Sequence, residues 1–175
     1  KTRFYCKPNI MQCSKNISYV LTDPKGEILR ATGKLLEKKG FEIRVLDLVN
    51  MDKSNCYNPF MYLESDNDVQ KLVTNLFKST TPKGASSNDP FWDIAAQMLL
   101  LALVFYLKYE APETEQNFSM VMEMLQYGEV KEDDENYQSP LDILFQRLEQ
   151  RAPNHIALKY YKSYRSGAAR TIKSI

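Results

Sequence analysis

The sequence is poor in the residues that hold metal ions or disulfide frameworks. It contains three cysteines, none of them paired as C-x-x-C, and one histidine. Cys6, Cys13 and Cys56 therefore indicate neither a disulfide framework nor a four-ligand zinc site, which fits a reducing cytoplasm. Because no serine or cysteine constellation accompanies His155, we interpret it as a structural or solvent-facing residue.

Long apolar runs and a dominant charge are also absent. The longest apolar run, residues 98–107, is ten residues and ends at Lys108, whereas a spanning helix requires about 20. Residues 1–20 contain no apolar core of a signal peptide. The 23 lysines and arginines nearly balance 22 acidic residues, so any attraction for nucleic acid must be local. We expect an internal, soluble and cytoplasmic segment of a longer protein, without a membrane anchor of its own.

The first third of the chain has the pattern of a strand, a helix and a second strand. Residues 18–22 are β-branched and aromatic and stop at Asp23-Pro24, which predicts a buried strand. Apolar residues recur at helical spacing over residues 27–39, and Gly40 follows as a stop signal. Residues 41–49 first alternate and then turn apolar, which predicts the second strand. Together these elements predict a βαβ unit with a parallel pair of strands.

After Asn58-Pro59 the pattern predicts helices only. The helix expected over residues 91–109 is apolar nearly all round and is therefore predicted to be central. Three further signals mark helix starts: Asp89-Pro90, a capping box formed by Ser139 and Asp142, and Asn154. Apolar stripes predict the other helices, at Val69, Leu72, Val73, Leu76 and Phe77, at Phe118, Val121, Met122 and Leu125, and at Leu141, Leu144, Phe145 and Leu148.

Two segments of the first part suggest phosphate chemistry. Lys1-Thr2 matches the end of G-x-x-x-x-G-K-[ST], in which the lysine reaches phosphates and the hydroxyl binds Mg²⁺. Lys-Thr pairs are common, so this pair alone identifies nothing. Residues 23–27 follow a predicted strand, where open α/β sheets place their ligands. The alternative is a simple turn in which Asp23 caps the following helix, and turn chemistry favours it.

Two charged segments of the second part suggest binding. Residues 129–135 hold five carboxylates without the spacing of an EF-hand, so a solvated loop is the first interpretation and a docking site for basic proteins the second. Lys159, Tyr160, Lys162 and Arg165 combine aromatic and basic side chains, as surfaces that bind single-stranded DNA do. The alternative is a surface helix whose tyrosines pack inward, because amphipathic spacing gives the same pattern.

Six separated segments together carry a family resemblance. They are KTRFY at 1–5, KPN at 7–9, YVLTDPKGE at 19–27, YNPF at 57–60, NDPFW at 88–92 and GAARTIKSI at 167–175. The chain resembles, over essentially its whole length, the TraG-like coupling proteins of type IV secretion systems. It is most similar to the branch found on mobile elements of Gram-positive bacteria.

The resemblance implies a fold and a division into domains. The expected class is α/β: a partial RecA-like P-loop domain over residues 1–60, interrupted by an all-α substrate-recognition domain over 61–165, with a return to the first domain over 166–175. The whole would be mostly helical. The resemblance places the protein at the cytoplasmic face of the membrane, with membrane helices before the phosphate loop.

The resemblance also implies a nucleotide site. Lys1 and Thr2 correspond to the lysine and threonine of the phosphate loop, with Thr2 on Mg²⁺ and Arg3 beside them. Asp23, Lys25 and Glu27 correspond to the strand-end motif next to ATP. The glycines before Lys1 and the acidic pair that activates water are not in this sequence, so we do not expect the segment by itself to hydrolyse ATP. One further departure is an arginine at position 170, where lysine is more usual.

The implied partners are relaxase and other relaxosome proteins, single-stranded DNA, secretion channel subunits and further copies of the chain in a homo-hexamer. The implied activity is ATP-driven delivery of relaxase-bound DNA to the channel. A second hypothesis is a helical binding module for relaxosome proteins or DNA that has no catalytic role. A third hypothesis is a different P-loop motor, such as a DNA translocase of cell division, which the coupling-protein pattern in several separated segments disfavours.

Overall fold

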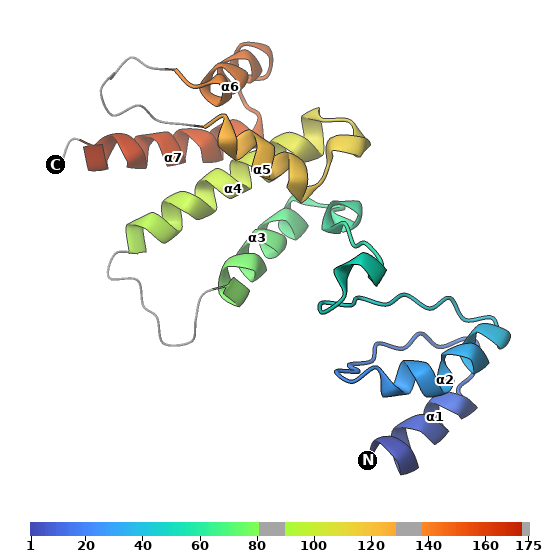
Figure 1. Cartoon of the computed structure of the whole chain (residues 1–175). Coiled ribbons are helices and arrows are strands. Elements are labelled where there is room, and N and C mark those ends of the chain that lie inside the picture. Colours follow the sequence, from blue (N-terminus) through green and yellow to red (C-terminus); the bar gives the residue numbers. More distant parts are fainter. Residues whose placement is uncertain (81–89, 129–137, 173–175) are drawn as a thin grey trace. The chain divides into compact units, whose positions relative to one another are not determined.

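The computed structural model describes residues 1–80, 90–128 and 138–172, and the chain divides into two compact units (Figure 1). Unit 1 comprises Lys1–Tyr57 and unit 2 comprises Asn58–Ile175. The division falls at Asn58-Pro59, where the sequence pattern changes from a mixed to a purely helical one.

Unit 1 is built on two helices that run in the same direction. A π-helical turn, Thr2–Cys6, leads into α1 (Lys7–Gln12), and α2 (Glu27–Lys38) packs against α1. The ammonium of Lys39, at the end of α2, donates to the carbonyl of Met11, at the end of α1. The carboxyl ends of both helices therefore lie together. A 3₁₀ turn, Met51–Lys53, completes the elements of this unit among the described residues.

The predicted βαβ unit is wrong, and with it the α/β, partly RecA-like class. Within residues 1–80, 90–128 and 138–172 the structure contains helices and no strand, so only the mostly helical character is confirmed. Residues 18–22 are irregular, and Val20 is fully exposed rather than buried in a sheet. The helix between the two predicted strands is present as α2.

Local hydrogen bonds explain why the second predicted strand does not form. Val45 exchanges hydrogen bonds with Asn55, donating to its side chain at 2.7 Å and accepting from its backbone at 2.8 Å. The carboxylate of Asp47 accepts from the backbone N–H groups of Val49 and Asn50, both at 2.9 Å. These bonds close a loop and use groups that a strand ladder requires. A pair of strands without further neighbours is also marginally stable.

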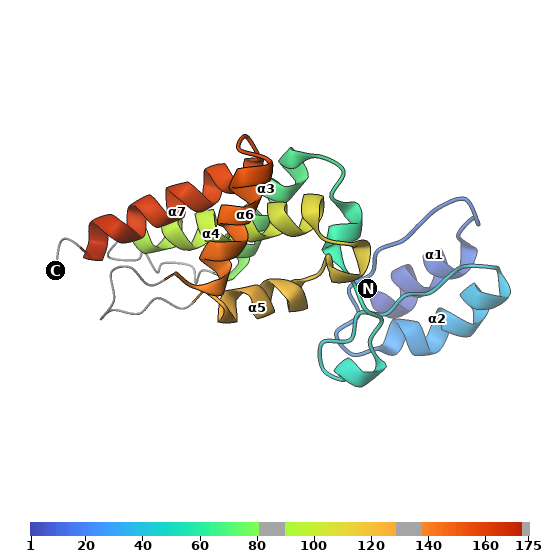
Figure 2. The same cartoon turned by 90° about the horizontal axis from the view of Figure 1, so that it is seen from above.

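Unit 2 is a helical bundle around one central helix (Figures 1 and 2). The central helix is α4 (Pro90–Glu110), which packs against α3, α5 and α7, and α6 packs on α7. The other elements are a 3₁₀ turn Pro59–Tyr62, α3 (Asp66–Thr80), a 3₁₀ turn Glu113–Glu115, α5 (Phe118–Gln126), α6 (Pro140–Arg151) and α7 (Ile156–Ile172). The predicted helices of this part are confirmed.

The core of unit 2 forms where the apolar stripes meet α4. Burying such side chains contributes roughly 1.5 to 3 kcal/mol each. The largest fully buried side chains of this core are Phe105, Phe145, Leu103, Leu107, Leu148, Val69, Val73, Val104 and Val121. Most of the predicted stripe residues of α3 and α6 thus face the core. On α5 the buried residues are Val121 and Met124, whereas Met122, which the predicted stripe includes, is 60% exposed.

Polar side chains fix the starts of the helices. The predicted capping box is confirmed. Ser139 Oγ accepts from the Asp142 N–H at 3.1 Å, and the Asp142 carboxylate accepts from the Ser139 N–H at 3.0 Å. The predicted cap of the last helix is off by one residue. His155 Nδ1, not Asn154, accepts from the Ala157 N–H at 3.1 Å. The predicted cap at Asp89 lies outside the described residues.

By length and composition, Phe91–Glu110 within α4 is apolar enough to cross a membrane. The ten-residue run seen in the sequence understates this helix, because aromatic and small residues extend its apolar character towards Pro90. The central helix of a water-soluble bundle meets the same criterion. In unit 2, α3, α5 and α7 cover the second half of α4, where Leu101, Leu103 and Leu107 are buried.

Candidate nucleotide and recognition sites

The three residues of the predicted phosphate site lie at the first turn of unit 1. Lys1 and Arg3 are exposed and Thr2 is partly buried. The Lys1 carbonyl accepts hydrogen bonds from the N–H groups of Tyr5, at 3.0 Å, and Cys6, at 3.3 Å. The Arg3 guanidinium lies 5.8 Å from the centre of the Phe4 ring, a cation–π contact. Lys1 is therefore the residue at which the first helical segment begins.

Asp23 caps α2. Its Oδ2 accepts from the backbone N–H groups of Ile28, at 2.9 Å, and Leu29, at 3.0 Å. Gly26 adopts φ 65°, a left-handed conformation that glycine tolerates best, so the turn brings Asp23 back over the helix start. The interpretation of Asp23 as a helix cap is thereby confirmed. Capping occupies one carboxylate oxygen and leaves Oδ1 for another partner.

The two halves of the predicted nucleotide site lie at the same end of unit 1. Because the carboxyl ends of α1 and α2 are joined through Lys39 and Met11, their amino ends also share one end of the unit, as both views show (Figures 1 and 2). Lys25 and Glu27 are exposed there. No hydrogen bond or ion pair links Lys1 or Thr2 to Asp23 within the described residues. The same residues contain no cluster of three metal-ligating side chains around Thr2.

Three of the four predicted recognition side chains on α7 are engaged inside unit 2. The Tyr160 ring stacks on Phe105 with centroids 5.4 Å apart, and its hydroxyl accepts from Gln70 at 3.1 Å. Lys162 pairs with Glu149 on α6. Arg165 Nε lies 3.2 Å from Asp142 Oδ1. Lys159 alone among the four is exposed without an ion pair in the described part of the chain.

Asp142 is the charge around which α6 and α7 are joined. Burial by itself would raise the pKa of its carboxyl, but hydrogen bonds from Tyr161 and Ser139 outweigh burial and lower that pKa. Tyr161 donates to Oδ1 at 2.7 Å, and its ring stacks on Phe145 with centroids 3.9 Å apart. Burial, followed by the hydrogen bond to Asp142, raises the pKa of Tyr161. The inward-packing interpretation of the tyrosines therefore holds for Tyr161.

Two depressions escaped the sequence analysis. One, of about 490 Å³, lies beside α2 and is lined by Leu29, Arg30, Gly33, Lys34, Glu37, Ile43 and Val45. The other, of about 250 Å³, lies between α4 and α6 and is lined by Tyr106, Leu144, Arg147, Leu148 and Arg151. The sequence signal that could have indicated the second depression is the spacing of Arg147 and Arg151 next to the leucines of an amphipathic helix.

The near-zero charge of the chain conceals two oppositely charged units. Unit 1 contains 11 lysines and arginines and six acidic residues, a net charge of +5. Unit 2 contains 12 basic and 16 acidic residues, a net charge of −4. Long-range attraction of phosphate therefore favours unit 1, whereas unit 2 repels polyanions overall.

The described residues form a basic unit with two aligned helices, followed in the chain by an acidic helical bundle. The family model described as type IV secretory system conjugative DNA transfer matches residues 1–170. The chain belongs to this family, and its role is in conjugative DNA transfer by type IV secretion. Neither a curated protein nor a solved structure matches the chain.

Proposed function

We propose that this chain is part of a coupling ATPase that recruits relaxase-bound DNA to a type IV secretion channel and uses ATP hydrolysis to drive its delivery. In this proposal Lys1 contacts the phosphates of ATP, Thr2 binds Mg²⁺, and Arg3, Asp23, Lys25 and Glu27 surround them. Unit 2 recognises the relaxase and its partners. Copies of the protein form a homo-hexamer that docks on channel subunits at the cytoplasmic face of the membrane.

The observation that carries this proposal is the parallel packing of α1 and α2. Parallel helices direct their amino ends, and with them the positive ends of their dipoles, to one side. Lys1, Arg3 and Lys25 add positive charge at that side, and unit 1 carries a net charge of +5. A triphosphate with Mg²⁺ is an anion that suits such an arrangement.

The test of the nucleotide assignment is a titration of the full-length protein with a fluorescent ATP analogue in the presence of Mg²⁺. We expect Lys1→Ala to weaken binding by about tenfold or more, because one charge-assisted contact to phosphate is lost. Lys15→Ala removes an exposed lysine from the turn after α1, at the end of that helix remote from Lys1, and serves as the matched control. Equal affinities of the Lys1→Ala variant and the unmodified protein would remove Lys1 from the site.

A second candidate function is a protein-recognition module without a catalytic role. It is favoured by the net charge of −4 on unit 2 and by the internal contacts of Tyr160, Lys162 and Arg165. The ATP titration separates the two candidates, and binding of a labelled single-stranded oligonucleotide at several salt concentrations tests for DNA contact by α7. Salt-sensitive binding that Lys159→Glu weakens supports DNA contact by α7, and salt-sensitive binding that this variant leaves unchanged places the contact elsewhere. Binding of relaxosome proteins without DNA binding supports the module.

A further inference from the structure

The depression between α4 and α6 has an apolar floor and a basic rim. Four of its five lining residues come from α6, at the spacing i, i+3, i+4 and i+7 that places side chains on one face of a helix. Leu148 is 2% exposed and forms the floor with Leu144. The Tyr106 ring closes the side, held by Phe145 at a centroid distance of 5.6 Å.

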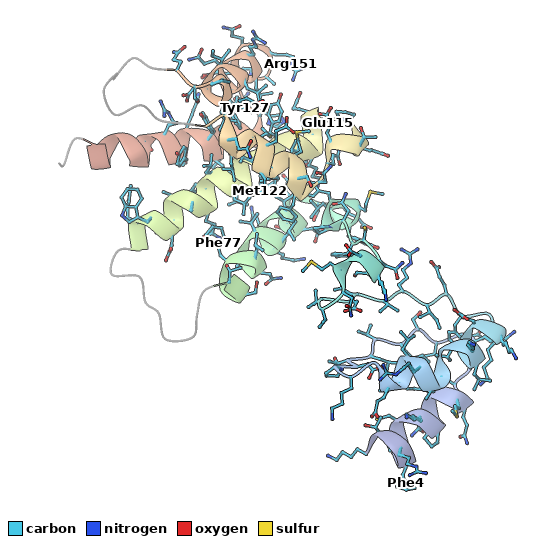
Figure 3. The ribbon with its side chains drawn as sticks, viewed as in Figure 1. Phe4, Phe77, Glu115, Met122, Tyr127 and Arg151 are labelled. Atoms are coloured by element: carbon cyan, nitrogen blue, oxygen red, sulfur yellow. The ribbon has the colours of Figure 1, made fainter. Side chains whose placement is uncertain are left out.

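The two arginines of the rim differ in what they already bind. Arg151, at the end of α6 (Figure 3), pairs with Glu110, at the end of α4. A guanidinium has five N–H groups, so this pair leaves part of its fork unused. Arg147 is exposed and makes no hydrogen bond or ion pair within the part of the chain that the structure describes. Its planar fork matches the two oxygens of a carboxylate.

The surroundings favour an acidic peptide over a nucleic acid. Glu110 and Glu115 lie near Tyr106, where their charges add to burial, the larger cause, in raising the pKa of its phenol. Glu149 lies on the same helix as the arginines. A nucleic-acid backbone carries a negative charge every few ångströms, so these carboxylates would repel it. A peptide with one carboxylate next to an aliphatic side chain contacts only Arg147 and the leucines.

We propose that this depression binds a short acidic and aliphatic segment of a partner protein. A carboxylate of the segment pairs with Arg147, and a side chain of the size of leucine rests on Leu144, Leu148 and Tyr106. The site extends the proposed recognition role of unit 2, and it does not depend on nucleotide binding. The depression is basic although unit 2 is acidic overall, so it attracts an acidic segment while the rest of the bundle does not.

The test is fluorescence anisotropy of the full chain with a set of labelled nonapeptides that place Leu or Ile beside Asp or Glu. Matched peptides carry Lys in place of every acidic residue, and a labelled oligothymidylate serves as the nucleic acid. We expect acidic peptides of the set to bind. Arg147→Glu is expected to lower their affinity by about tenfold or more, because a charge-assisted contact is lost. Arg147→Gln is expected to have an intermediate effect.

Lys78→Glu is the matched control, because Lys78 is likewise exposed without an ion pair among the described residues but lies on α3, outside the depression. It reverses the same charge, and we expect it to change peptide affinity by less than about twofold. Circular dichroism of both variants confirms that the bundle is intact. The proposal is overturned if no acidic peptide binds, if Arg147→Glu and Lys78→Glu weaken peptide binding equally, or if Arg147→Glu weakens binding of the oligothymidylate more than binding of the acidic peptides. The ATP titration is a separate measurement, so each assignment fails independently.

Discussion

The phenol of Tyr161 donates a hydrogen bond of 2.7 Å to Oδ1 of Asp142, and this bond ties α7 to the first turn of α6. The other carboxylate oxygen of Asp142 accepts from the hydroxyl and the N–H of Ser139, at 2.8 Å and 3.0 Å. The Asp142 side chain thus completes the capping box of α6 and also positions α6 against α7. Arg147 is not used by these contacts and has no ion pair within the described residues.

Replacement of Asp142 is expected to destabilise unit 2 strongly. Asp142→Ala removes the carboxylate half of the capping box and leaves the buried Tyr161 hydroxyl without its acceptor, for a loss of about 2 to 4 kcal/mol in the free energy of unfolding. Urea unfolding followed by circular dichroism measures this loss. Glu149→Ala breaks the exposed pair with Lys162 and is expected to cost less than about 1 kcal/mol. Similar losses for both variants would contradict the role given to Asp142.

Alkaline pH is expected to destabilise the same contact. The folded pKa of Tyr161 is raised, so its stabilising contribution is complete below the unfolded pKa of about 10 and is lost as the pH rises above that value. One tyrosine can contribute up to about 1.4 kcal/mol per pH unit in that range. The free energy of unfolding of the protein and of Tyr161→Phe, compared between pH 9 and 11, measures this contribution. A pH dependence that Tyr161→Phe leaves unchanged would assign the titration to other tyrosines.

The central position of α4 predicts a large cost for Phe105→Ala. Phe105 is fully buried and stacks on Tyr160, so its truncation is expected to lower the free energy of unfolding by about 3 to 5 kcal/mol. Met122→Ala on α5 shortens a side chain that is 60% exposed (Figure 3), and we expect a change within about 0.5 kcal/mol. Thermal or urea unfolding compares the two, and equal effects would contradict the packing of the bundle.

Asp23 allows its capping role to be separated from a role in nucleotide binding. Asparagine has the same shape and keeps an accepting oxygen, so Asp23→Asn is expected to keep the stability within about 0.5 kcal/mol, whereas Asp23→Ala costs about 1 kcal/mol. If the carboxylate also faces ATP and Mg²⁺, Asp23→Asn weakens ATP binding although it leaves stability unchanged. Unfolding and ATP titration of both variants test this. Full ATP affinity in Asp23→Asn would restrict Asp23 to capping.

The helices of unit 2 were predictable because their signals are local. The stripe that includes Phe145 and the capping box of Ser139 and Asp142 lie within a few residues of the element they define. The missed cap at His155 has the same origin, since Asn154 is the commoner capping residue but its neighbour's ring nitrogen lies at the helix start.

The predicted strands failed because a strand depends on partners that are distant in sequence. The β-branched pattern around Val20 describes a preference for extended backbone, and no ladder in the described chain uses it. Local bonds from Asp47 and Asn55 then decide the second segment. The expected edge of parallel strands beside Asp23 is therefore absent from this structure.

The candidate sites were partly predictable for similar reasons. The turn chemistry at Asp23 identified a cap, which the structure confirms. The basic and aromatic pattern of α7 could not separate outward from inward side chains, because the contact of Arg165 with Asp142 joins two helices that are apart in sequence. The second depression also needs two helices, since Tyr106 on α4 completes the site of Arg147.

The measurement that tests the proposed coupling ATPase most directly is the frequency of conjugative DNA transfer from donor cells that carry the Lys1→Ala protein. The account predicts a fall of at least about a hundredfold, the scale on which loss of one charge contact impairs phosphoryl transfer. Donors with Lys15→Ala are predicted to transfer at the unmodified frequency, with both variant proteins present in equal amounts. Transfer by Lys1→Ala donors at the Lys15→Ala frequency would contradict the account.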